Sequence, residues 1–249
     1  EMTVRMAHPV LLVTYGLLWL GGVGVYCLGV RSAHTSWGGP AFLVCAALLA
    51  MWNAPGARTW LLAVAAGDFL AELLGAHTGF PFGPYSYSPA LQPQLAGVPA
   101  VMSCAWVVLI AYVKSLEAAS PTCPWRRVAA GALGMVLIDL AIEPVAAGPL
   151  QYWRWCAQGL YYGVPCQNFF GWFLVSALLL ACGVRRRIAG PWPRRVGLSV
   201  VLFFGLLGAC HGALASPLVA TAISLLHYGA GRRLVTSSHT GPAKAAATL

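Results

Sequence analysis

Four of the six acidic residues lie inside strongly apolar stretches, where a carboxylate is costly to bury. They form two pairs with the same spacing, Asp68 with Glu72 and Asp139 with Glu143. A spacing of four residues places both carboxylates of a pair on one face of a helix. Like charges this close repel in a medium of low dielectric constant, so we expect at least one acid of each pair to be protonated. A neutral carboxylic acid beside a carboxylate suits general acid–base catalysis, and we predict that these four residues are catalytic.

A loop rich in aromatic residues, Gly and Pro follows each acidic pair, at residues 77–94 and 148–166. Either the aromatic residues anchor the protein at the membrane surface, or the loops fold back over a pocket in the bundle. In the second case, side chains in or beside the loops are candidates for substrate binding. These are His77, Tyr85, Tyr87, Trp106, Trp153, Trp155, Tyr161, Tyr162 and Asn168. The competing interpretation is that a hydrogen-bond partner merely neutralises each acid, but the matched positions of the four acids favour a functional site.

The elements that must position these residues are transmembrane helices. The chain of 249 residues is 59% hydrophobic and 8% charged, with a mean hydropathy of +0.74. A soluble domain carries about a quarter charged residues, which excludes a water-soluble domain. About 20 apolar residues cross a bilayer as a helix. The apolar runs predict eight such helices, with seven as the alternative, at residues 9–30, 39–53, 59–77, 97–114, 128–147, 167–184, 197–213 and 216–230.

The predicted fold is therefore an all-α membrane helix bundle. Residues 1–234 form its single transmembrane domain, and the small, polar residues 235–249 form a disordered cytoplasmic tail. The last two helices are short, and Pro217 is expected to mark the break between them.

Lys and Arg are unevenly divided between the two sides of this bundle. With eight helices, 13 of the 15 basic residues fall on the side of both termini, and only Arg31 and Arg154 fall on the other. The positive-inside rule then places both termini in the cytoplasm. A formal charge of +9 would indicate nucleic-acid binding in a soluble protein, but basic residues between apolar runs set membrane orientation instead. We expect the lipid bilayer, and no nucleic acid, as a partner.

Several kinds of site are missing from the sequence. It has no glycine-rich loop followed by Lys and Ser or Thr, and neither a CxxC nor an HExxH motif, so no P-loop or metal site of these types is expected. Its two lysines, Lys114 and Lys244, are not well inside a helix, which excludes a retinal Schiff base. Cys156 and Cys166 share the second aromatic loop on the non-cytoplasmic side, where they either form a disulfide or remain free thiols.

The two aromatic loops and the helices around them resemble a known family. Residues 72–87 read ELLGAHTGFPFGPYSY, which resembles the E-x₂-G-x₂-T-G-x-P-F-G-x-Y-x-Y signature of the CruF-type carotenoid biosynthesis family. The second half is similar in DLAIEP at residues 139–144, WRW at 153–155 and YYGVP at 161–165. The resemblance covers roughly residues 60–175, with both halves in the right order.

This family includes carotenoid 1,2-hydratases and the bisanhydrobacterioruberin hydratase of C50 carotenoid synthesis. The resemblance implies addition of water to the terminal C1,C2 double bond of an acyclic C40–C50 carotenoid in a bacterial or archaeal cell membrane, without a redox cofactor. The residues suit that chemistry. A protonated Asp or Glu can protonate C2, aromatic faces can stabilise a tertiary cation at C1, and a second carboxylate can deprotonate water.

Two other functions fit parts of the sequence. The acidic pairs could hold Mg²⁺ against a diphosphate, as in a membrane prenyltransferase or terpene cyclase, although only Arg154 is close in sequence to bind the phosphates. The acids could instead form the relay of a proton-coupled carrier. The recurrence of the D-x₃-E spacing 71 residues apart, each time before an aromatic loop, indicates repeated halves of the kind that transporters contain.

Overall fold

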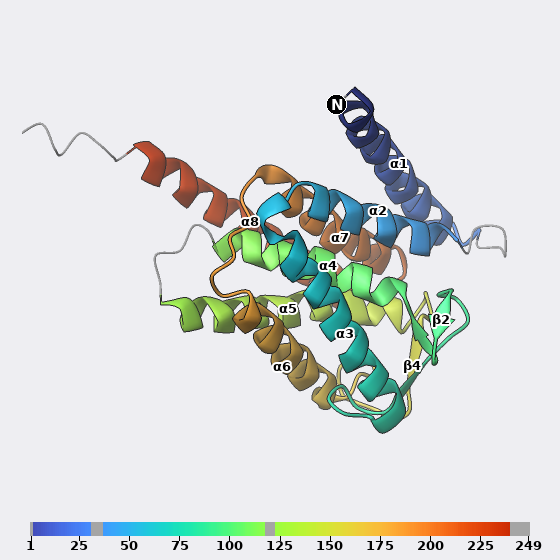
Figure 1. Cartoon of the computed structure of the whole chain (residues 1–249). Coiled ribbons are helices and arrows are strands. Elements are labelled where there is room, and N and C mark those ends of the chain that lie inside the picture. Colours follow the sequence, from blue (N-terminus) through green and yellow to red (C-terminus); the bar gives the residue numbers. More distant parts are fainter. Residues whose placement is uncertain (1, 31–36, 118–122, 240–249) are drawn as a thin grey trace, which may run out of the picture.

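The computed structural model describes residues 2–30, 37–117 and 123–239. Eight α-helices account for most of this part of the chain, and short β-strands lie at one end of the bundle (Figure 1). In chain order the elements are α1 (Met2–Cys27), α2 (Gly38–Trp52), the 3₁₀ turn η2 (Pro55–Ala57), α3 (Arg58–Thr78), β1 (Tyr85–Tyr87), β2 (Gln94–Leu95), β3 (Val98–Pro99), α4 (Val101–Glu117), α5 (Pro124–Ala146), β4 (Trp153–Trp155), α6 (Cys166–Cys182), α7 (Pro191–Cys210) and α8 (Ala215–His239). One helix corresponds to each predicted apolar run, which confirms the all-α bundle.

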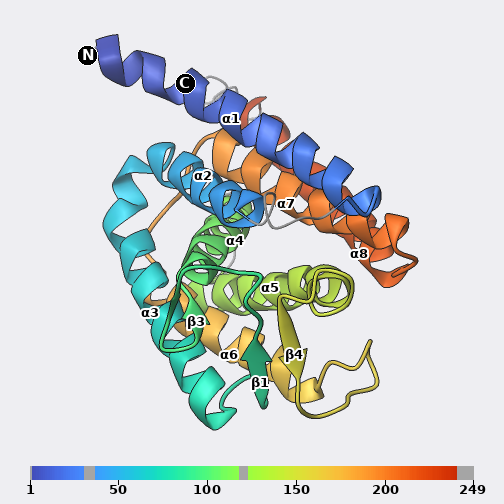
Figure 2. The same ribbon diagram turned by 90° about the vertical axis from the view of Figure 1, so that its right-hand side faces the viewer.

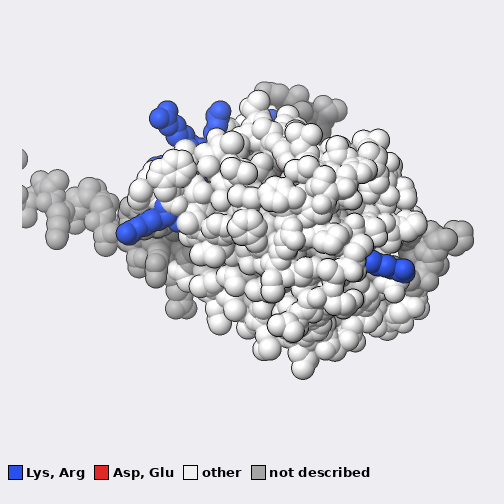
Figure 3. Space-filling view, turned by 90° about the horizontal axis from the view of Figure 1, so that it is seen from below, with Lys and Arg blue, Asp and Glu red and all other residues white. Residues whose placement is uncertain are grey.

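The outer surface of the bundle is that of a membrane protein. The face in Figure 3 is almost free of charge, with Lys and Arg only at opposite edges. Large apolar side chains such as Leu70 and Leu178 point outward, with 65% and 61% of their surface exposed. A continuous apolar surface of this kind requires a lipid environment. Within the described residues, four stretches are long and apolar enough to cross a membrane: His8–Cys27, Pro55–Thr78, Pro124–Ala146 and Pro191–Cys210.

α4 lies at the centre of the bundle and is contacted by α2, α3, α5 and α7 (Figure 2). Most of its side chains are buried, and Trp106 and Tyr112 have no exposed surface. On α7, Gly197 lets the two helices approach, because a Cβ atom there would overlap the ring of Tyr112. The aromatic residues of α4 therefore form the packed centre around which the helices that carry the acids are fixed.

The break between the last two helices differs from the predicted one. α7 ends at Cys210 and α8 begins at Ala215. Gly212 turns the chain between them with φ +74°. The expectation that Pro217 marks the break is wrong, because Pro217 lies in the first turn of α8, where its missing N–H has no helical partner in any case. The predicted tail covers residues 235–249, but residues 235–239 belong to the last turns of α8, which ends at His239. Residues 240–249 lie outside the described part of the chain.

A disulfide joins Cys27, the last residue of α1, to Cys210, the last residue of α7. The two residues are 183 positions apart, so only the tertiary structure brings their Cα atoms to 5.4 Å. Cys156 and Cys166 are free and exposed. Of the two states considered for this pair, the structure therefore has the free thiols and not the disulfide.

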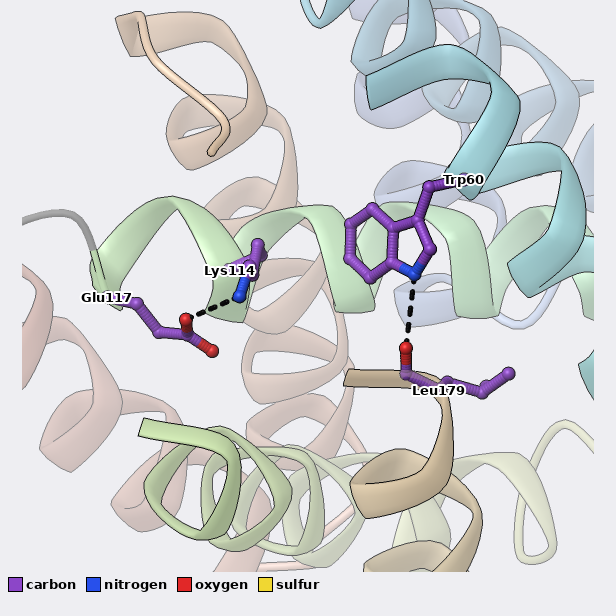
Figure 4. A network of polar contacts seen from close by, with 4 residues as sticks. All are labelled: Trp60, Lys114, Glu117 and Leu179. Atoms are coloured by element: carbon purple, nitrogen blue, oxygen red, sulfur yellow. Dashed lines mark hydrogen bonds and ion pairs between the residues drawn. The ribbon is translucent and has the colours of Figure 1, made fainter. Parts of the chain in front are cut away.

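Two polar contacts lie at the end of the bundle opposite the β-strands, one within α4 and one between α3 and α6 (Figure 4). Lys114, in the last turn of α4, forms an ion pair of 2.7 Å with Glu117, and both side chains are buried. Near the start of α3, the indole of Trp60 donates a hydrogen bond of 3.1 Å to the carbonyl of Leu179 on α6. Lys114 thus has a local partner and does not reach the four acids in the spans.

Candidate active site

The two aromatic loops meet in a short antiparallel ribbon beside the ends of α3 and α5 (Figure 2). β1 and β4 pair so that Tyr85 lies opposite Trp155 and Tyr87 lies opposite Trp153. Because successive residues of a strand point to opposite faces, these four aromatic side chains share one face, while Ser86 points the other way and is exposed. The loops therefore fold back over the bundle, which is the second of the two arrangements that the sequence allowed.

Glu72 of α3 receives its hydrogen bonds from the tyrosines of β1. The Tyr85 hydroxyl donates to Glu72 Oε2 over 2.5 Å, and the Tyr87 hydroxyl donates to the same oxygen over 2.7 Å. Burial, followed by the nearby charge of Glu72, raises the pKa of both phenols above the ordinary value. Both hydroxyls therefore remain protonated donors at neutral pH.

Glu143 of α5 receives its hydrogen bonds from nitrogen donors instead. The indoles of Trp153 and Trp155 donate to Glu143 Oε2 over 3.2 and 3.1 Å. The amide of Asn168, on α6, donates to Glu143 Oε1 over 3.2 Å. An indole N–H and an amide NH₂ donate but cannot accept. Both oxygens of Glu143 are therefore surrounded by groups that favour a carboxylate.

The remaining two acids lie one turn deeper on the same helix faces, and both have no exposed surface. Asp139 Oδ2 accepts a hydrogen bond of 2.7 Å from Asn168, so this amide bridges Asp139 and Glu143. Asp68 is different, because neither of its carboxyl oxygens has a hydrogen-bond partner among the described residues. The hydroxyl of Ser103 is also buried without a hydrogen-bond partner among the described residues. A buried carboxyl group of this kind is costly, and no hydrogen bond to a described residue offsets the cost.

Glu72 and Glu143 line one small cavity between the ribbon and the helices. Its volume of about 20 Å³ is enough for roughly one water molecule. One acid of each pair, 71 residues apart in the chain, thus lines a common cavity, while Asp68 and Asp139 are not part of its wall. Most of the remaining wall is aromatic. The residues that line the cavity are Glu72, Phe82, Tyr85, Tyr87, Met102, Glu143, Trp153, Trp155, Asn168 and Trp172.

Two glycines allow the first aromatic loop to reach the cavity. A Cβ atom at Gly75 of α3 would lie 2.8 Å from the ring of Phe82 and 3.0 Å from the hydroxyl of Tyr85. A Cβ atom at Gly171 of α6 would lie 2.6 Å from the same phenyl ring. Phe82 is therefore held between two helices that approach it closely only because neither residue has a side chain.

Four predicted substrate-binding residues lie outside the cavity wall. His77 is exposed at the end of α3, where its ring contacts the carbonyl of Ala96 at 3.2 Å. Trp106 lies behind the wall and stacks on Trp172, with ring centroids 4.7 Å apart. The hydroxyl of Tyr161 donates to the carbonyl of Leu140 over 2.6 Å, and burial raises its pKa to about 12. The hydroxyl of Tyr162 accepts from the backbone N–H of Ala215 over 3.4 Å. Their contact with substrate stays a prediction.

Phe82 and Met102 also belong to the wall, although neither was among the residues predicted to bind substrate. Phe82 belongs to the aromatic run that follows α3, so its position in that run was the available signal. Met102 lies in the first turn of α4 and looks like an ordinary apolar residue of a transmembrane helix, so no sequence signal distinguished it.

The arrangement suits proton transfer to an apolar group. Within residues 2–30, 37–117 and 123–239, no three His, Cys, Asp or Glu side chains are grouped so as to hold a metal ion. The oxygens of Glu143 and Oε2 of Glu72 are directed at O–H and N–H donors, which occupy the lone pairs that a cation would need. Two glutamates with different donors, a water-sized space and aromatic walls are the parts that acid catalysis on an apolar substrate requires.

Comparisons with known proteins agree with this description. The model of a family described as carotenoid biosynthesis protein matches residues 38–227, which include all four acids and both strands of the ribbon. The bisanhydrobacterioruberin hydratase of Haloarcula japonica is 33% identical over 162 residues, which cover 58% of this chain and 54% of that protein. The chain thus spans about half the length of this relative. No solved structure matches the chain.

Proposed function

The chain belongs to the carotenoid biosynthesis protein family, and from this premise we propose that it is a carotenoid hydratase. It adds water across the terminal C1,C2 double bond of an acyclic carotenoid end and forms a tertiary alcohol. The relative named as a hydratase supports this reaction. The observation that carries it is the water-sized cavity between Glu72 and Glu143, which is walled by aromatic side chains inside an apolar bundle.

Glu72 is the proton donor in this proposal. Both tyrosine hydroxyls bind its Oε2, so Oε1 is the oxygen that can carry the transferable proton into the cavity. Protonation of C2 forms the new C–H bond from the π electrons of the alkene and leaves a tertiary cation at C1. A positioned acid of this kind contributes about 10² to 10⁴ in rate.

Glu143 is the carboxylate of the resting site. Its three N–H donors can only donate, so a proton on either oxygen displaces one of them and is held only briefly. The charge stabilises the cation at C1 and orients the water whose oxygen bonds to that carbon. The water gives its proton to Glu143, and the water that refills the cavity returns this proton to Glu72, which completes the cycle.

The aromatic wall stabilises the cation and limits the size of the cavity. The faces of Trp153, Trp155 and Tyr87 offer π density to the tertiary cation, an interaction that strengthens when water is excluded. The cavity holds about one water molecule, so the carotenoid end must displace aromatic side chains in order to enter.

The site faces the non-cytoplasmic side in this proposal, with both termini in the cytoplasm. Arg127, Arg185, Arg186 and Arg187 gather around one cleft, which includes the end of α4 and the start of α5. That cleft lies at the end of the bundle opposite the ribbon, because α5 begins there and ends beside β4. The positive-inside rule assigns this end to the cytoplasm.

Expression in a host that makes lycopene tests the reaction. We expect a carotenoid with a tertiary hydroxyl group, whose oxygen comes from water when the cells are grown in water enriched in heavy oxygen. Unlabelled oxygen in the product would instead indicate an oxygenase. Unchanged lycopene, together with magnesium-dependent turnover of a prenyl diphosphate, would replace the proposal by a prenyltransferase or cyclase.

A further inference from the structure

A second and much larger cavity lies between α1, α2 and α7. Its volume is about 510 Å³, within the range of sites for small apolar ligands. Leu17 and Trp37, which line it, have 66% and 63% of their surface exposed, so the cavity opens toward the outside of the bundle. A hydrocarbon can therefore enter it from the bilayer without crossing water. We call this cavity the α1–α2–α7 groove.

The groove has no means of recognising a charged headgroup. None of the described residues that line it is charged, and nearly all of its surface is apolar. Six of the lining side chains are aromatic: Tyr26, Trp37, Phe42, Tyr152, Phe203 and Phe204. The rings of Phe42 and Phe203 stack with centroids 5.2 Å apart. Extended aromatic faces of this kind pack well against a flat, conjugated chain.

The groove and the candidate active site share a boundary. Tyr152 lines the groove, while Trp153, the next residue, lines the cavity that contains the two glutamates. The two rings have centroids 6.4 Å apart. At this boundary the Tyr152 hydroxyl is hydrogen-bonded to the hydroxyl of Tyr26, over 2.9 Å. The wall between the two cavities is therefore formed by neighbouring aromatic side chains of one loop.

The difference in size between the active-site cavity and a carotenoid also requires a second binding surface. The active-site cavity has room for about one water molecule, whereas a carotenoid continues for dozens of carbon atoms beyond the double bond that reacts. Those carbon atoms need an apolar surface that begins next to the site.

We propose that the α1–α2–α7 groove binds the polyene chain of the substrate while its end group reacts between Glu72 and Glu143. This inference rests on the proposed function, since it assigns the rest of the same substrate. The chain enters from the bilayer between α1 and α2 and runs past Tyr152 to the site. Binding energy from this remote part of the substrate then serves to hold the reacting end in place.

The variant Gly21→Phe tests the groove. Gly21 lines the groove, and a Cβ atom there meets nothing within 4 Å, so the backbone at this position tolerates a side chain. Gly16→Phe is the matched control. It makes the same substitution in α1, where a Cβ atom also meets nothing within 4 Å, but Gly16 does not line the groove. Five residues separate the two positions, which places them about 140° apart around the helix.

Two substrates with the same acyclic end separate groove binding from catalysis: a full-length carotenoid and a short terpenoid that cannot reach the groove. We expect Gly21→Phe to raise KM for the carotenoid at least ten-fold and to leave kcat/KM for the short terpenoid unchanged. Gly16→Phe should leave both unchanged. An unaltered KM for the carotenoid in Gly21→Phe, or an equal loss for both substrates, would overturn the proposal.

A binding measurement keeps this test independent of the hydratase reaction. In the Glu72→Gln background, which should bind without turnover, Gly21→Phe should weaken binding of the carotenoid at least ten-fold in lipid nanodiscs. This result is measurable even if the wild-type protein hydrates neither substrate, an outcome that would reject the proposed function alone. If Gly21→Phe instead releases a bound phospholipid, detected by mass spectrometry, and binds the carotenoid normally, the groove is a lipid site and the proposal is wrong.

Discussion

Replacing each active-site glutamate by glutamine should have different effects on stability, because the two side chains have different hydrogen-bond donors. Glu143 accepts N–H groups at both oxygens. In Glu143→Gln the new NH₂ group must face either the two indoles or the amide of Asn168. Asn168 cannot rotate to accept it without losing its bond of 2.7 Å to Asp139. At least one hydrogen bond to a charged group is lost, so the free energy of unfolding should fall by about 2 kcal/mol.

Glu72→Gln should be nearly neutral for stability. Both tyrosine hydroxyls donate to Oε2, and the glutamine carbonyl oxygen can take that position. The NH₂ group then points where the proposal places the transferable proton. Turnover should fall by about 10² to 10⁴, since the amide has no proton to give. Glu143→Gln should lose turnover as well, through loss of the charge that stabilises the cation.

The assay combines two measurements on each purified variant. Thermal unfolding in detergent gives the change in stability, and chromatography of carotenoids after incubation with an acyclic substrate gives the turnover. Equal destabilisation by both substitutions would refute the distinction between hydroxyl and N–H donors. Turnover close to that of the wild type in Glu72→Gln, with normal expression, would refute its role as the proton donor.

Four further results are expected. Asp68→Asn should leave the melting temperature unchanged or raise it, because neither carboxyl oxygen has a hydrogen-bond partner to lose among the described residues. It should lower turnover at least ten-fold if this costly group serves the reaction, and unchanged turnover would remove Asp68 from the catalytic set. Trp155→Phe should lower turnover about ten-fold, because it removes one hydrogen-bond donor from Glu143. Ser86→Ala, on the outer face of the same ribbon, is the control and should have no effect. Equal losses of turnover in both variants would point to a general defect of the ribbon. Activity should survive EDTA, since protonation and water capture need no metal, and activity that Mg²⁺ restores after chelation would contradict this. Cys27 and Cys210 should resist alkylation in intact membranes until a reductant is added, and labelling of both without reductant would show that the disulfide does not form.

The helices and the candidate residues of the site could be predicted from the order of residues along the chain. Long apolar runs with few charges leave helices as the only elements that satisfy every backbone group in lipid, so one helix of the structure corresponds to each run. The i, i+4 spacing placed Asp68 with Glu72, and Asp139 with Glu143, on common helix faces, because that relation is local. The aromatic loops were visible as candidates from their composition alone.

Which side chains contact one another depends on packing between distant segments and was not predictable. Alternation along β1 and β4 directs Tyr85 and Tyr87 to Glu72 and directs Trp153 and Trp155 to Glu143, but the register that pairs the two loops depends on contacts about 70 residues apart in the chain. The same dependence made the Cys27–Cys210 bridge invisible in the sequence. Composition could not separate His77, Trp106, Tyr161 and Tyr162, which lie outside the cavity, from the aromatic residues that line it. A residue type sets what a side chain can donate or accept, and packing between distant segments sets what lies within reach.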